Sequence, residues 1–270
     1  MSVLMIDCIL SSAAIVFGIS RRKVHEEENG GAMIEVSHVF KELSGQIVLD
    51  DITLTVSPGE ILAILGGSGA GKSVLLQHLM GLMKPNRGSI KIDSVDITKL
   101  SEDELLKLRK RIGYLFQEGA LYDFMDVFEN IAFPLREHSK LSETEIAKKV
   151  RDILDIVDLT GVEEKYPAQL SGGMKKRAAL ARSVILDSKI LFCDEPTSGL
   201  DPILSREISN LIRDISRRFH TTTVVTSHDI PNSLRIADRL TLIHQGKLVI
   251  TGTKAQFESS EHPLIREFIG

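Results

Sequence analysis

Residues 61–73 of the chain read ILAILGGSGAGKS, and this stretch is the strongest indication of the fold. The run from Ile61 to Leu65 is short and apolar, which is typical of a buried strand. The eight residues that follow, Gly66 to Ser73, match the pattern G-x-x-x-x-G-K-[ST]. The next stretch, VLLQHLMGLM, has apolar residues at helical spacing. The sequence therefore predicts a strand, a glycine-rich loop and a helix in direct succession.

This loop has the composition of a phosphate-binding loop. Its glycines let several backbone N–H groups face phosphate oxygens, and the following helix directs its positive end to the same place. Lys72 adds a cation for the β- and γ-phosphates of ATP, and the Ser73 hydroxyl is suited to ligate Mg²⁺. A glycine-rich turn without a ligand is the alternative, which the complete motif disfavours. The predicted nucleotide-binding residues here are Gly66, Gly67, Ser68, Gly69, Ala70, Gly71, Lys72, Ser73 and Val74.

The composition is that of an ordinary globular protein. The 270 residues suffice for one large α/β domain or two small ones, with 43% hydrophobic and 26% charged residues. A formal net charge of −4 gives no electrostatic reason to expect a nucleic-acid partner. The two cysteines, Cys8 and Cys193, do not suggest a disulfide framework, so a reducing compartment fits.

The first 32 residues have a character of their own. Residues 1–20 are mostly apolar apart from Asp7, and Arg21-Arg22-Lys23 follow them. A secretory signal carries its positive charge before the apolar run, so this order disfavours one. Three interpretations stay open, namely a wrongly assigned start or dispensable tail, a peripheral membrane anchor, and a membrane span. We treat residues 1–32 as an extension and residues 33–270 as the functional domain.

Residues 33–270 contain regions with a strand pattern and one region with a helical pattern. MIEVSHVF and IVLDDITLTV alternate apolar and polar residues, as half-buried antiparallel strands do. Residues 118–189 read instead as a helical insert, in which Ser142 and Glu145 form a capping-box pattern. Ser101 and Glu104 form another such pattern before a short basic helix. One face of the insert's first capped helix is expected to carry Ile146, Val150, Ile153, Leu154 and Val157.

A buried strand that ends in two acidic residues follows the insert. The run ILFCD at 190–194 is apolar until Asp194, and Glu195 comes next. Asp194 would reach the Mg²⁺ beside the phosphate-binding loop, and Glu195 would orient or deprotonate an attacking water. Taken alone, a strand that ends in Asp-Glu is more often structural than catalytic. Together with an upstream phosphate-binding loop, a catalytic role is favoured.

On these motifs the chain resembles the ATP-binding cassette (ABC) ATPases over residues 33–270. LSGGM at 170–174 resembles the family signature LSGGQ, with Met174 in place of glutamine. The resemblance implies an α/β P-loop fold with a RecA-like core, an antiparallel β subdomain and a helical signature subdomain at about 118–189. It also implies a head-to-tail homodimer, in which Ser171, Gly172 and Gly173 cover the ATP bound by the other subunit.

The same resemblance assigns four further residues. Gln117 matches the Q-loop, which senses Mg²⁺ and water and communicates with a transmembrane partner, although a lone glutamine after a strand is normally a surface residue. Asp201 matches the D-loop at the dimer interface, and His228 matches the switch histidine at the γ-phosphate. Phe40 lies near the place of the family's adenine-stacking aromatic, if one extra residue before Leu49 is allowed. Phe40 as a core residue is the alternative.

A narrower resemblance rests on LFQEGALYDFMDVFENIAFPLREHS, residues 115–139, with LSGGM and MKKRAALAR. These stretches look like the ATPase subunit of Mla-type, MCE-associated phospholipid transporters. That resemblance implies permease, MCE-domain and lipid-transfer partners, and a peripheral place on the cytoplasmic side of the inner membrane. Another ABC importer, a lipoprotein-release ATPase, a non-transport ABC protein and a binding module without hydrolysis are the alternatives.

The segment after Gln117 also carries several apolar residues whose role the sequence leaves open. Leu121, Phe124 and Phe128 either fill the junction between the core and the helical insert or line a groove for a permease helix. Substitution of Phe124 by aspartate separates these two interpretations, because it unfolds the subunit only if Phe124 is part of the core.

Overall fold

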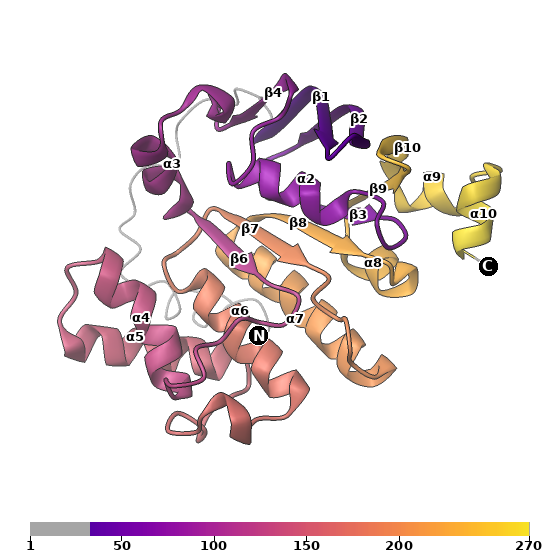
Figure 1. Ribbon diagram of the computed structural model, residues 1–270. Coiled ribbons are helices and arrows are strands. Elements are labelled where there is room, and N and C mark those ends of the chain that lie inside the picture. Colours follow the sequence, from indigo (N-terminus) through magenta and orange to yellow (C-terminus); the bar gives the residue numbers. More distant parts are fainter. Residues whose placement is uncertain (1–32, 270) are drawn as a thin grey trace, which may run out of the picture. The chain divides into compact units, whose positions relative to one another are not determined.

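The computed structural model describes residues 33–269 (Figure 1). The three interpretations of residues 1–32 fall outside the described part of the chain. The described residues form two β-sheets with helices around them. The smaller sheet is antiparallel and has the order β2-β1-β4-β5. Its strands are β1 (Ile34–Leu43), β2 (Gln46–Val56), β4 (Arg87–Ile92) and β5 (Val95–Asp96).

The strands of the smaller sheet confirm the predicted alternation. Along β2, Ile52, Leu54 and Val56 are buried while Thr53 and Thr55 are exposed; Leu49 is buried as well, but Asp51, with a φ of +58°, interrupts the alternation between Leu49 and Ile52. The alternation in β1 is interrupted at His38, which has a φ of +50° beside a shift of register between Val36 and Val39. Two further shifts of register follow, between Val39 and Lys41 and between Lys41 and Glu42, and together these irregularities change the direction in which the second half of β1 faces.

The larger sheet has six strands in the order β10-β9-β3-β8-β7-β6. Strands β6, β7, β8, β3 and β9 are parallel, and β10 pairs antiparallel with β9. Every residue of β3 and β8 is buried, as expected for parallel strands that are covered on both faces. The carboxyl ends of the parallel strands meet at one edge of the sheet, which therefore gathers the residues that follow them. The six strands are β3 (Ile61–Leu65), β6 (Ile112–Leu115), β7 (Ile190–Asp194), β8 (Thr222–Ser227), β9 (Arg239–His244) and β10 (Lys247–Thr253).

Nine α-helices accompany the sheets within residues 33–269, with the 3₁₀ turns η1 (Ile97–Lys99) and η2 (Pro167–Gln169). The capping boxes predicted at Ser101 with Glu104 and at Ser142 with Glu145 are confirmed, and each begins a helix. No helix in this part of the chain is long and apolar enough to span a membrane. The helices are α2 (Lys72–Leu79), α3 (Glu102–Arg109), α4 (Val127–His138), α5 (Glu143–Ile156), α6 (Gly172–Val184), α7 (Pro202–Phe219), α8 (Ile230–Ile236), α9 (Lys254–Glu258) and α10 (Pro263–Ile269).

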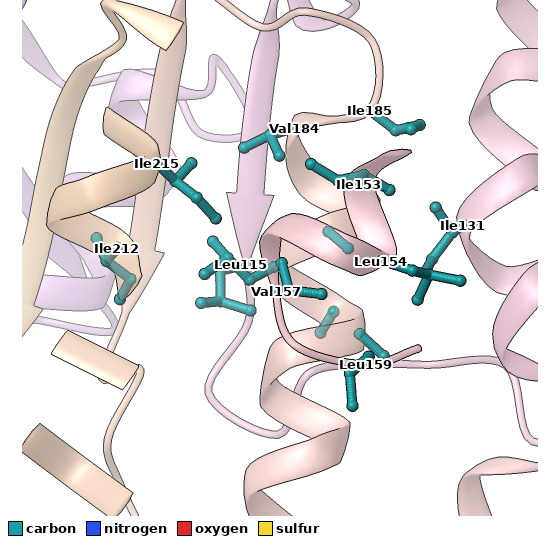
Figure 2. Close-up of a cluster of buried hydrophobic side chains, with 14 of the residues drawn as sticks. Leu115, Ile131, Ile153, Leu154, Val157, Leu159, Val184, Ile185, Ile212 and Ile215 are labelled. Atoms are coloured by element: carbon teal, nitrogen blue, oxygen red, sulfur yellow. The ribbon is translucent and has the colours of Figure 1, made fainter. Parts of the chain in front are cut away.

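Helices α4, α5 and α6 share one hydrophobic cluster with β6, β7 and α7 (Figure 2). The predicted apolar face of α5 is confirmed, since Ile146, Val150, Ile153 and Leu154 are all buried there and Val157 is buried just after the helix. Leu115 at the end of β6 and Ile212 of α7 belong to the same cluster. The segment after Gln117 and the LSGGM helix α6 are therefore packed on a common core with the sheet edge.

Candidate active site

The glycine-rich loop joins β3 to α2 at the carboxyl edge of the larger sheet. Two of its glycines are required because a side chain would have no room there, and one of them also because of its backbone conformation. A Cβ atom at Gly66 would lie 2.5 Å from the Ile243 carbonyl oxygen, and one at Gly71 would lie 2.8 Å from the Val48 carbonyl oxygen. Gly71 also has a φ of +105°, which residues with side chains rarely adopt. The loop can keep this shape only with glycine at both positions.

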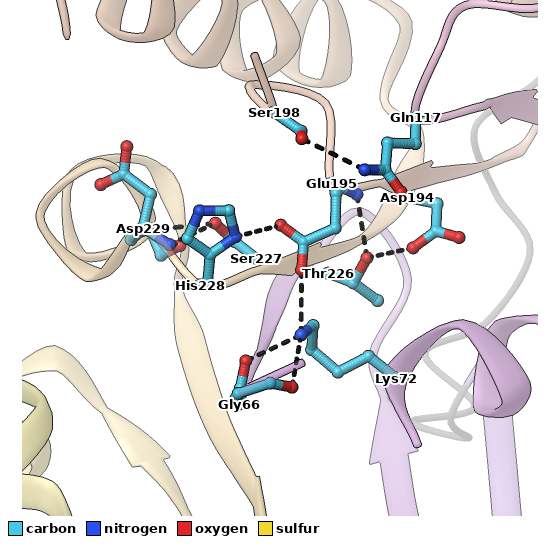
Figure 3. Close-up of polar contacts among 12 residues, drawn as sticks. Gly66, Lys72, Gln117, Asp194, Glu195, Ser198, Thr226, Ser227, His228 and Asp229 are labelled. Carbon is cyan, nitrogen blue, oxygen red and sulfur yellow. Dashed lines mark hydrogen bonds and ion pairs between the residues drawn. The ribbon is translucent and has the colours of Figure 1, made fainter. Parts of the chain in front are cut away.

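Lys72, the first residue of α2, is held at the base of the loop (Figure 3). Its ammonium group donates hydrogen bonds to the carbonyl oxygens of Gly66, at 2.7 Å, and Gly67, at 3.0 Å. It also forms an ion pair with Glu195 Oε1 at 2.9 Å. Both side chains are nearly buried, with exposed fractions of 7% for Lys72 and 11% for Glu195. The lysine predicted to bind phosphate and the acid predicted to handle water therefore lie in direct contact.

Both oxygens of the Glu195 carboxylate have partners. His228 Nδ1 donates to Oε2 over 2.7 Å, so that Glu195 lies between a lysine and a histidine (Figure 3). The Glu195 backbone has a φ of +45°, and its N–H donates to Thr226 Oγ1 over 3.0 Å. A non-glycine residue with positive φ is usually maintained by the surrounding structure at a functional site. Glu195 is thus fixed in a single orientation at the end of β7.

Asp194 accepts hydrogen bonds from three hydroxyl groups. Ser73 Oγ and Thr226 Oγ1 donate to Asp194 Oδ1, at 3.0 Å and 2.6 Å. The Tyr114 hydroxyl donates to Asp194 Oδ2 at 3.3 Å. Burial, together with the nearby Asp194 charge, raises the pKa of Tyr114, which keeps its hydroxyl protonated. A carboxylate beside a serine hydroxyl is a set of hard oxygen donors, which fits Mg²⁺.

Gln117 follows β6 and faces the same edge of the sheet. Its Nε2 donates to Ser198 Oγ over 3.1 Å (Figure 3). The backbone of this segment is tied to α6, because Lys176 donates to the Gln117 carbonyl oxygen and Arg182 Nη2 donates to that of Gly119 at 2.9 Å. Burial lowers the pKa of both cationic side chains. Two side-chain hydrogen bonds thus connect the backbone at Gln117 and Gly119 to α6, the helix that begins within the LSGGM stretch.

A cavity of about 650 Å³, a size typical of small-molecule sites, adjoins these residues, although Gly66, Gly67 and Asp194 are not among those that line it. The predicted residues Gln117, Glu195 and His228 line it together with Ser68 to Val74 of the loop. Ser198, the first residue of the stretch that matches the D-loop, also lines it, as do Leu43 and Val48, to which the sequence did not point. Thr226 is a further unpredicted member of the site, and its position two residues before His228 was the available signal.

The structure corrects the expectation for Phe40. Phe40 does not line this cavity but pairs with Arg87 of β4, whose guanidinium carbon lies 4.3 Å from the ring centroid. The register of β1 shifts between Val36 and Val39 and again on both sides of Lys41, and the end of the strand reaches the cavity through Leu43 instead. An apolar aliphatic surface, rather than the expected aromatic ring, thus faces the loop from β1.

The LSGGM residues and Asp201 also lie outside this cavity. Ser171 begins α6 as its N-cap and accepts a hydrogen bond from the backbone N–H of Met174 at 3.3 Å. Ser171 and Gly172 are exposed, whereas Gly173 is buried and Met174 packs against the hydrophobic cluster. Asp201 caps α7 by accepting from the N–H groups of Ile203 and Leu204. Within one subunit these residues do not meet the phosphate-binding loop.

Together, the phosphate-binding loop, the Asp194-Glu195 strand end, His228 and the separate LSGGM helix define an ABC ATPase. The chain belongs to the ABC transporter family, whose family model matches residues 49–198. It is an ATP-binding subunit of an ABC transporter, and it hydrolyses ATP to drive transport. The expected ABC ATPase fold is confirmed.

Among similar proteins is a probable ribonucleotide transport ATP-binding protein, mkl, of Mycobacterium tuberculosis strain H37Rv. It is 43% identical over 239 residues, which are 88% of this chain and 67% of mkl. The intermembrane phospholipid transport system ATP-binding protein MlaF of Haemophilus influenzae is 40% identical over 237 residues, 88% of this chain and 90% of MlaF. The methionine import ATP-binding protein MetN of Haemophilus ducreyi is 40% identical over 242 residues, 88% of this chain and 70% of MetN.

Solved structures show the same architecture. The ATP-binding cassette MJ0796, in a dimeric post-hydrolysis state bound to ADP and phosphate, has a TM-score of 0.76 at 30% identity. The match covers 82% of this chain and 99% of that one. CbiO1 of Clostridium perfringens, part of the cbiONQ transporter complex, has a TM-score of 0.79 at 32% identity, covering 87% of this chain and 94% of that one.

Proposed function

We propose that this chain powers phospholipid transport between the inner and outer membranes of a diderm bacterium and so maintains outer-membrane lipid asymmetry. The observation that carries this proposal is the resemblance of residues 115–139, supported by 40% identity to MlaF over 88% of the chain. The relatives mkl and MetN support two other substrate classes, a ribonucleotide and methionine. The three candidates share the same ATPase chemistry and differ in the partners that the segment after Gln117 must contact.

For ATP, we assign roles to the residues that the structure brings together. The loop from Gly66 to Ser73 binds the phosphates through its N–H groups, and Lys72 adds positive charge at the β- and γ-phosphates. Ser73, Gln117 and Asp194 are the residues that would hold Mg²⁺. When bound, that ion neutralises negative charge on the phosphate oxygens.

Hydrolysis follows from the placement of Glu195. Its carboxylate takes a proton from the attacking water, whose oxygen forms a bond to the γ-phosphorus while the bond to the ADP oxygen breaks. Because Lys72 and His228 hold one carboxylate oxygen each, Glu195 is oriented before the reaction begins. His228 has a largely exposed side chain, with 62% of its surface accessible, so it can also reach a γ-phosphate.

A second subunit would complete the site. The exposed Ser171 and Gly172 at the start of α6 lie outside the cavity of their own chain, which favours their use on another chain's ATP. We propose a head-to-tail homodimer, with Asp201 near the subunit interface. The MJ0796 cassette is dimeric in two solved structures, which supports a dimer. The subunit's partners would be permease subunits, an MCE-domain protein and lipid-transfer proteins, without nucleic acid, on the cytoplasmic side of the inner membrane.

Co-purification of the tagged full-length chain from membranes tests the lipid assignment. We expect a permease and an MCE-domain protein to accompany it, and the reconstituted complex to move phospholipid with ATP. Lys72→Ala is the matched control, because it should keep the partners while ATP hydrolysis falls to background. Recovery of a methionine-binding protein, or transport of a ribonucleotide instead of phospholipid, would contradict the proposal and favour the corresponding alternative.

A further inference from the structure

We propose that Tyr114 is a positioning residue for the Asp194 carboxylate and links it to a second cavity beside β6. This inference rests on the proposed role of Asp194 as an Mg²⁺ ligand. It concerns a residue that no sequence motif marks, three positions before Gln117 in the run IGYLFQ.

The topology of the sheet brings Tyr114 and Asp194 together. Strands β6 and β7 are parallel neighbours, and Tyr114 is paired with Phe192, two residues before Asp194. The long tyrosine side chain spans this offset, so its hydroxyl reaches Asp194 Oδ2 at 3.3 Å. Ser73 and Thr226 both donate to the other oxygen, Oδ1. Tyr114 therefore holds the side of the carboxylate that these two hydroxyls leave open.

Hydrogen bonds to both carboxylate oxygens matter for a metal ligand. A carboxylate that is held at Oδ1 alone can rotate about its Cβ–Cγ bond, and the rotation redirects the oxygen that faces the ion. A donor on Oδ2 fixes the plane of the carboxylate. Partners that orient a metal ligand in this way commonly change metal affinity by 10-fold or more when they are removed. The Tyr114 hydrogen bond is fairly long, so a smaller effect is expected here.

The other side of Tyr114 faces a different cavity. Its ring lies 4.4 Å, between centroids, from the ring of Phe116, and the two planes are inclined by 50°. Both residues line a cavity of about 960 Å³ between α3 and α4, together with Tyr122 and Phe133. This cavity does not include the phosphate-binding loop. A group that displaces the Phe116 ring would therefore act on Tyr114, and through its hydroxyl on Asp194.

Tyr114→Phe tests the positioning role because it removes only the hydroxyl. The binding of a fluorescent ATP analogue by the full-length chain is measured against free Mg²⁺ concentration, and again in EDTA. We expect half-maximal Mg²⁺-dependent binding to require threefold to tenfold more Mg²⁺ in Tyr114→Phe, about the range of one lost hydrogen bond. Binding in EDTA should not change, and the melting temperature should fall by no more than about 2–4 °C, as for one lost hydrogen bond. Tyr122→Phe is the matched control, since it removes a hydroxyl from the same cavity, and its Mg²⁺ requirement should equal that of the wild type.

Phe116→Ala tests the link to the second cavity, because it leaves the Tyr114 hydroxyl in place. We expect a Mg²⁺ requirement about twofold higher than in the wild type. An unchanged Mg²⁺ requirement in Tyr114→Phe, or an equal shift in Tyr122→Phe, overturns the positioning role. A shift in Tyr114→Phe that is absent in Phe116→Ala overturns the link between the cavities. If the wild-type chain itself bound the nucleotide without any dependence on Mg²⁺, the proposed metal site would fail along with this inference.

Discussion

Phe124→Asp is expected to separate subunit stability from partner binding. Phe124 precedes α4 and is 75% exposed, and its ring centroid lies 5.7 Å from that of Tyr122. Phe128, in α4, packs against the large hydrophobic cluster instead. The structure thus places Phe128 in the junction between core and insert and leaves Phe124 available to a partner. Leu121 packs against the same cluster as Phe128.

The size of the effect follows from the exposed fractions. A phenylalanine offers about 200 Å² of surface, so the buried quarter of Phe124 contributes about 1 kcal/mol at 25 cal/mol per Å². In a chain of this length that corresponds to about 2–4 °C in melting temperature. Phe128→Asp is the matched control, because it places the same charge against the core. It should cost about 3 kcal/mol, or about 6–12 °C.

Two measurements on each variant check this reasoning. Thermal unfolding of the isolated subunit gives the change in stability, and recovery of the permease with the tagged subunit gives partner binding. We expect Phe124→Asp to keep its fold and its ATP binding but to lose the permease and lipid transport. A fall in melting temperature as large as that of Phe128→Asp would show that Phe124 belongs to the core. Normal permease recovery would show that the docking surface lies elsewhere.

Three further outcomes are expected. Glu195→Gln keeps the shape of the side chain but removes the base, so ATP should bind and a closed dimer should accumulate without turnover. Absence of ATP-dependent dimerisation in the assembled complex would contradict the head-to-tail arrangement. Burial, with a smaller contribution from Lys41, lowers the pKa of His78, so the unfolded chain binds more protons as the pH falls below about 6.5. The free energy of unfolding should therefore fall from pH 7 to pH 5, by no more than about 1.4 kcal/mol per pH unit. In His78→Asn, urea unfolding should show a weaker dependence of this free energy on pH. An equal pH dependence in both proteins would exclude His78 as its source. A chain that begins at Met33 should fold and hydrolyse ATP normally, whereas loss of membrane association on that truncation alone would support the anchor interpretation of residues 1–32.

Short-range patterns in the sequence determined much of the fold. The strand, loop and helix around Lys72 were predictable because apolar runs, glycines and a helical period act within about 20 residues. The capping boxes at Ser101 and Ser142 were predictable for the same reason, since each joins groups only three positions apart. The burial of Ile153 and its neighbours followed from the period of α5.

The tertiary structure decided the contacts that depend on register and on the order of strands. Phe40 and Leu43 are three residues apart, and the successive shifts of register in β1, from Val36 to Glu42, determine which of them reaches the nucleotide cavity. Tyr114 and Asp194 are 80 positions apart in the chain, and they meet because β6 is the neighbour of β7. Composition and periodicity do not specify which strands become neighbours, because that choice depends on the packing of the whole core.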